Sequence, residues 1–127
     1  MGTTEYSRGT FTLETNSNYS SVNLDKVPIA VINDGGAFEI WAPDRDSARG
    51  TYITAYNGHV SPWVGPDAPT SNQCLTQAMS NPASKIVIVP GMLICVITSE
   101  GRTGYITVQT VAVGSAVFQA VIWEKPS

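Results

Sequence analysis

The sequence predicts an all-β domain, an antiparallel β-sandwich or flattened barrel of about 8–10 short strands that ends in a three-stranded meander. Short runs rich in Val, Ile, Thr, Tyr and Phe recur along the chain, and these residues suit a pleated, half-buried surface. Clusters of Gly, Pro, Asn and Asp separate the runs, as turns require. Asn72–Met79 lacks runs of β-branched residues and predicts one or two turns of helix.

The composition is that of one small folded domain. The chain has 127 residues, and 43% of them are hydrophobic, which argues against disorder. Charged residues make up only 13%, about half the usual share. The net charge of −3 and seven scattered Lys and Arg residues exclude a nucleic-acid interface. We expect residues 1–8 to be a flexible lead-in and residues 9–127 to form a single domain.

The first half of the chain predicts one isolated strand and two hairpins. Gly9–Thr15 alternates apolar and polar residues, as a half-buried strand does. Val27–Asn33 and Ala37–Ala42 flank an Asp-Gly-Gly turn and predict the first hairpin. Thr51–Tyr56 and His59–Val64 flank Asn-Gly, the strongest turn signal here, and predict the second.

The C-terminal third predicts the meander. Its strands are Met92–Ser99, Arg102–Ala112 and Ser115–Glu124, and a glycine stands in each connecting turn. If both turns are two-residue loops, Cys95 lies opposite Ile106. Alternation then predicts one apolar, core-facing set. Its members are Leu93, Cys95, Ile97, Ile106, Val108, Val121 and Trp123, with Gly104 beneath the indole.

The same segment carries a resemblance to a known family. Gly91, Cys95, Val96, Thr98, Glu100, Gly101 and Arg102 follow the pattern Gly-x-x-x-Cys/Ala-Val-x-Thr-x-Glu-Gly-Arg/Asn. This strand–turn–strand resembles the end of a small β module of actinobacterial and cyanobacterial proteins. The module stands alone as a secreted domain or is appended to other proteins, including receptor-like kinases. The resemblance implies an extracytoplasmic β fold and no particular biochemical activity.

The two cysteines, Cys74 and Cys95, allow two interpretations. They could be buried free thiols, but we favour a disulfide, which would stabilise the fold by roughly 3 kcal/mol. Zinc is not expected, because His59 is the only histidine. No metal, nucleotide or haem motif is present in the sequence, so we expect no cofactor.

The predicted location is extracytoplasmic. The first residues lack the basic start and apolar run of a signal peptide, and no stretch approaches the roughly 20 apolar residues of a membrane span. The chain is therefore either cytoplasmic or a secreted domain whose leader is absent from this sequence. We favour the secreted alternative because of the cysteines and the resemblance.

Aromatic residues provide the main functional hypothesis. Trp41, Tyr52, Tyr56, His59 and Trp63 fall on neighbouring predicted strands. The second hairpin would place Tyr56 opposite His59 and Tyr52 near Trp63. Such rings, flanked by hydroxyls and amides, suit sugars or peptide segments. The alternative is that they only cover one end of the core.

Catalytic and ionic candidates are weaker. His59 has Ser61 two residues away, but two residues do not make a catalytic triad. Asp44 and Asp46 are spaced as in some calcium loops, but arginines flank them and further ligands are missing. Arg102 could bind an anion or simply support its turn.

We therefore expect a non-enzymatic, extracytoplasmic binding module for a protein or a glycan. The expected ligand-binding residues are Trp41, Tyr52, Tyr56, His59, Trp63 and Arg102. The alternative is a structural or self-assembling β subunit, of a surface or phage type, that forms homo-oligomers through edge strands.

Overall fold

The computed structural model describes residues 5–14, 21–32, 38–41, 52–55, 59–65, 67–98, 100–112 and 115–124. These residues form ten strands and one helix, so the all-β prediction is confirmed. In chain order the elements are β1 (Glu5–Glu14), β2 (Ser21–Asn23), β3 (Ala30–Ile32), β4 (Phe38–Trp41), β5 (Tyr52–Ala55), β6 (His59–Trp63), α1 (Ser71–Ser80), β7 (Lys85–Val87), β8 (Leu93–Ile97), β9 (Thr103–Ala112) and β10 (Ser115–Trp123).

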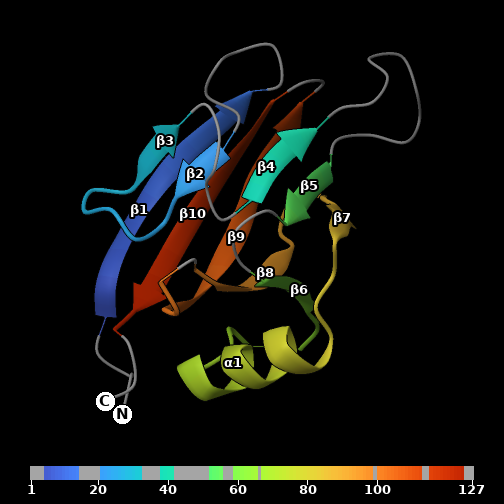
Figure 1. Ribbon diagram of the computed structural model, residues 1–127. Helices are drawn as coiled ribbons and strands as arrows, with labels where there is room; N and C mark the ends of the chain where they lie inside the picture. Colours follow the sequence, from blue (N-terminus) through green and yellow to red (C-terminus); the bar gives the residue numbers. More distant parts are fainter. Residues whose placement is uncertain are drawn as a thin grey trace.

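The strands form two antiparallel, five-stranded sheets. The first, which we call sheet A, has the order β1-β10-β9-β8-β6, and the second, sheet B, has the order β3-β2-β4-β5-β7. The predicted meander is confirmed, since β8, β9 and β10 are neighbours in sheet A. Figure 1 shows the short strands of sheet B in front of the long strands of sheet A, with α1 beside β6 and β8.

One hydrophobic core lies between the sheets. Both contribute fully buried side chains, among them Leu13 and Phe118 from sheet A and Val22 and Ile53 from sheet B. The rings of Phe11 and Phe118 stack with their centroids 5.2 Å apart. The first strand supports this core over more residues than expected, because β1 begins at Glu5, inside the predicted lead-in.

The turn between β8 and β9 differs from the predicted two-residue loop. Ile97 pairs with Thr103, and the Thr98 amide donates to the Arg102 carbonyl at 2.7 Å. Three residues therefore form the turn, with Gly101 at a φ of 92°, a conformation that favours glycine. The extra residue shifts the register by one and exchanges the two faces of β8 relative to β9.

The register between β9 and β10 is also corrected. Next to their turn the pairing is the one expected, but a bulge between Val117 and Phe118 shifts it by one residue. As a result Ile106 lies opposite Ala120, not Val121. A bulge of this kind depends on the packing of the whole sheet, and the local sequence does not indicate it.

The two shifts reverse the predicted faces of β8 and β10, whereas Ile106 and Val108 of β9 face the core as predicted. The buried residues on the core side are Ile94, Val96, Ile106, Val108, Phe118, Ala120 and Ile122. Cys95 instead pairs with Tyr105 and lies on the outer face. Gly104 is covered by Ile122 rather than by Trp123, because an added Cβ would lie 2.5 Å from the Ile122 Cδ1 atom.

Both hairpins predicted in the first half of the chain are wrong. β4 pairs with β2 and β5, so β2 separates it from β3. β5 pairs with β4 and β7, whereas β6 pairs with β8 in the other sheet. The Asn-Gly turn itself lies outside the described residues. The chain crosses from sheet B to sheet A between β5 and β6. Ile53 on β5 and Val60 on β6 are both fully buried, and they enter the core from opposite sheets.

Candidate functional site

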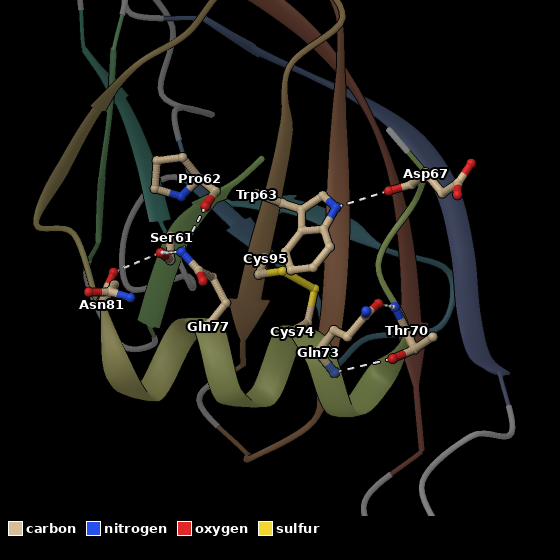
Figure 2. Close-up of a disulfide and its surroundings, with 10 residues drawn as sticks. All are labelled: Ser61, Pro62, Trp63, Asp67, Thr70, Gln73, Cys74, Gln77, Asn81 and Cys95. Atoms are coloured by element: carbon tan, nitrogen blue, oxygen red, sulfur yellow. Dashed lines mark hydrogen bonds between the residues drawn. A yellow bond between two sulfur atoms is a disulfide. The ribbon is translucent and has the colours of Figure 1, made fainter. Parts of the chain in front are cut away.

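Helix α1 is attached to the outer face of sheet A by a disulfide. Cys74 lies on the buried side of α1, and its Sγ atom is 2.12 Å from that of Cys95 on β8. The predicted disulfide is therefore confirmed. Cys95 is fully buried although it is on the outer face, because α1 covers it (Figure 2).

A capping box fixes the start of the helix. The backbone N–H of Gln73 donates to the Thr70 hydroxyl at 3.2 Å, and the side-chain oxygen of Gln73 accepts from the backbone N–H of Thr70 at 2.8 Å. Two amide groups that would otherwise lack partners at the helix start are thereby satisfied. The side chain of Gln73 is consequently held in one orientation.

The side-chain amide of Gln77 joins the helix to the edge strand β6. The Gln77 Nε2 group donates to the Ser61 hydroxyl and to the Pro62 carbonyl, each at 3.1 Å. Ser61 is fully buried and donates in turn to the Asn81 carbonyl at 2.7 Å. Proline is tolerated in β6 because this strand is the edge of sheet A.

Trp63 ends β6 and is held beside the helix. Its indole Nε1 donates to the Asp67 carbonyl at 3.0 Å, and its ring packs against the backbone of Gly65. The residue is only partly buried, so part of the indole remains accessible. Figure 2 shows the indole close to the disulfide, with Gln73 and Gln77 to either side in this view.

These elements form an open groove, which we call the Trp63 groove. It has a volume of about 320 Å³ and is lined by Trp63, Asn72, Gln73, Thr76 and Gln77. None of these five residues is charged, and four of them carry hydroxyl or amide groups. Most of the accessible lining is apolar, and the amide and hydroxyl groups add a few polar points, which is the usual composition of a small-molecule site.

The predicted aromatic surface is divided between the two sheets. Trp41 in β4 pairs with Tyr52 in β5, both in sheet B, whereas Trp63 belongs to sheet A. Lys85 lies over the Tyr52 ring with its Nζ atom 4.4 Å from the centroid. Tyr56 lies outside the described residues. The predicted placement of Tyr52 near Trp63 is wrong, because it required β5 and β6 to pair and the two strands belong to different sheets. A ligand-binding role of the individual residues stays a prediction.

His59 is exposed at the first position of β6. It shares a strand face with Ser61 and Trp63, but Ser61 is fully occupied in joining β6 to the helix end. The buried hydroxyl therefore has a structural role. The Asp44–Asp46 loop lies outside the described residues.

Arg102 belongs to a separate cluster that joins the two sheets, which we call the Asp25 clamp. Its Nη1 group donates to the Asp25 carboxylate at 2.9 Å and to Glu100 at 3.0 Å, and its guanidinium stacks on Tyr6 at 3.8 Å. The Asp25 carboxylate also accepts from the Thr98 hydroxyl at 2.6 Å. The Glu-Gly-Arg turn thus positions a cation for an acid of the chain itself.

The charge of Arg102 is stabilised in this cluster. Burial by itself lowers the pKa of the guanidinium, but hydrogen bonds to Asp25 and Glu100 outweigh it, so the pKa of Arg102 is raised. The Nε atom is buried without a hydrogen bond, and Glu124 lies 3.8 Å away from it. An ion pair with so few exposed atoms leaves little of Arg102 for an external anion.

The groove residues other than Trp63 were not among the predicted ligand-binding residues. A signal was available, since Thr70 and Gln73 have the spacing of a capping box before the predicted helix. Four residues further on, Gln77 lies on the same flank of the helix. The contact between this flank and Trp63 depends on α1 being attached to sheet A.

No helix in the described part of the chain is long and apolar enough to cross a membrane. No protein-family model, no curated protein and no solved structure matches the chain. The resemblance to the actinobacterial and cyanobacterial module therefore stays a prediction.

Proposed function

We propose that this chain is a non-catalytic, extracytoplasmic binding module that holds a neutral glycan in the Trp63 groove. The observation that carries the proposal is the composition of the groove, an accessible indole beside amide and hydroxyl groups with no charged side chain. Sugars present an apolar face and a polar rim, which an aromatic ring and amides complement.

Rigidity of the groove supports binding. The disulfide attaches the helix, Gln77 joins it to β6, and the Trp63 indole is held by the Asp67 carbonyl. A preformed site loses less conformational entropy when a ligand binds, which favours affinity.

The disulfide also supports the proposed location. Disulfides persist mainly in oxidising compartments, such as the periplasm or the cell exterior, and the described cysteines are both bonded. The expected secretion of the domain agrees with this chemistry.

The test is calorimetric titration with a panel of neutral, soluble oligosaccharides. Trp63→Ala should weaken binding at least roughly tenfold, since a single well-placed tryptophan often dominates an interface. Trp123→Ala is the matched control, because Trp123 is a partly exposed tryptophan of the same sheet that packs on Tyr105 and does not line the groove. Equal affinity of both variants and wild type would contradict the proposal, as would the absence of binding to any glycan.

A second candidate function is self-assembly through the edge strand β7. This strand lies at the edge of sheet B, and Val87 and Val89 are 52% and 56% exposed. Exposed edge strands pair readily with other strands. Light scattering would detect the oligomer, and Val87→Lys should dissociate it. A monomer at high protein concentration would contradict this candidate.

A further inference from the structure

We infer that the Trp63 groove selects sugars that carry an N-acetyl group. This inference rests on the proposed function and specifies the ligand class of the same site. It depends on which atoms of two glutamine side chains remain for a ligand after each has made its structural hydrogen bonds.

Gln73 presents a donor. Its side-chain oxygen accepts from the Thr70 amide at 2.8 Å, which determines which end of the amide group is the oxygen. The Nε2 group has no hydrogen-bond partner among the described residues. Since Gln73 lines the groove, its two N–H donors remain for a ligand acceptor.

Gln77 presents an acceptor. Its Nε2 group uses both of its N–H donors, one on Ser61 and one on the Pro62 carbonyl. The Oε1 atom has no partner within the part of the chain that the structure describes. The two orientations are therefore opposite: Gln73 offers hydrogen atoms, and Gln77 offers lone pairs.

This pair matches a secondary amide. Gln73 and Gln77 are four residues apart on α1, so their side chains are neighbours on one flank of the helix. The carbonyl of an acetamido group would accept from Gln73, its N–H would donate to Gln77, and its methyl group would contact the indole of Trp63. Both glutamine groups are neutral and fixed, which disfavours a sugar that lacks the amide.

The test compares N,N′-diacetylchitobiose with cellobiose, which has hydroxyls in place of the acetamido groups, by calorimetry on the full chain. We expect the acetylated sugar to bind at least roughly tenfold more tightly, the gain that one or two net hydrogen bonds provide. Equal binding of the two sugars would overturn this inference but leave the proposed function standing. Failure of both sugars and of the wider panel would overturn both.

Gln73→Glu sharpens the test. The carboxylate keeps an acceptor for the Thr70 amide and preserves the capping box, but it removes the donor to the ligand. The variant should lose the preference for the acetylated sugar while its thermal unfolding stays unchanged. Gln119→Glu is the matched control, because this exposed glutamine on β10 also accepts a hydrogen bond through its oxygen, from Gln109. A preference retained in Gln73→Glu would overturn the inference.

A peptide bond is also a secondary amide, so a peptide control is needed. Trialanine with both ends blocked carries the amide but no sugar ring. We expect it to bind at least roughly tenfold more weakly than the acetylated sugar, since it lacks the flat apolar face that packs on the indole. Equal or tighter binding of the peptide would overturn the assignment to an acetylated glycan.

Discussion

The disulfide and the Asp25 clamp both anchor strand β8, but they do so by different physical means. On the outer face, one covalent bond joins Cys95 to the helix, and its surroundings are neutral amides. At the turn that follows the strand, Thr98 and Arg102 bind the Asp25 carboxylate, which lies just after β2. The disulfide attaches a helix to a sheet, and the Asp25 clamp joins the two sheets.

This difference explains why the candidate site lies beside the disulfide. A disulfide needs no charged partner, so the surface around it can stay neutral and accessible. In the clamp the buried Asp25 carboxylate and the Arg102 guanidinium require each other, because a charge buried without a partner is costly. These two side chains are 4% and 13% exposed, so little of either is accessible to a ligand.

Disruption of the Asp25 clamp should have the largest effect on stability. Asp25→Ala leaves the guanidinium of Arg102 buried without its main acceptor and should lower the free energy of unfolding by about 4 kcal/mol. Urea unfolding at neutral pH measures the loss. In the double variant Asp25→Leu with Arg102→Met the loss should be smaller, because no buried charge remains. A double variant less stable than Asp25→Ala would contradict this account of the clamp.

Removal of the disulfide should have the next largest effect on stability. Replacing Cys74 and Cys95 together by alanine should lower the free energy of unfolding by about 3 kcal/mol, since the bond restricts the unfolded chain. The same change should follow from a thiol reductant in the wild-type protein and should be absent in the variant. A reductant effect that persists in the variant would exclude the disulfide as its cause.

The capping box should contribute less. Gln73→Ala removes the acceptor for the Thr70 amide and should lower the free energy of unfolding by roughly 0.5–1 kcal/mol. Gln73→Glu retains that acceptor and should unfold as the wild type does. Thermal unfolding followed by circular dichroism compares the three proteins, and equal stability of the alanine variant would contradict the role of the box.

The smallest effect is expected at an exposed ion pair. Glu5 and Arg8 on β1 contact each other in solvent, and the hydrogen bonds from Arg8 lower the pKa of Glu5. Because the folded-state pKa is depressed, the contribution is present above the unfolded-state pKa and is lost as the pH falls through the folded-state value. Stability of wild type and Glu5→Gln should therefore converge in acid, as unfolding at several pH values would show. Curves that diverge in acid would contradict the sign.

The sequence by itself determined the kind of elements in this protein. Alternating and β-branched runs predicted β1, β5 and the three strands of the meander because side-chain periodicity is a local property. The absence of β-branched runs predicted α1, and the Thr70–Gln73 spacing marks its start. The pairing of Cys74 with Cys95 could be predicted because the sequence contains only these two cysteines.

Only the tertiary structure decided which strands pair and which face is buried. One extra turn residue before Arg102 reversed the predicted face of β8, and one bulge after Val117 reversed that of β10, since side chains alternate with a period of two. The Asn-Gly turn signal before His59 is a local property of the sequence. The placement of β5 and β6 in different sheets depends instead on the packing of the whole core. The candidate site depends on the same long-range choice, because Trp63 meets the helix only where Cys95 lies on the outer face.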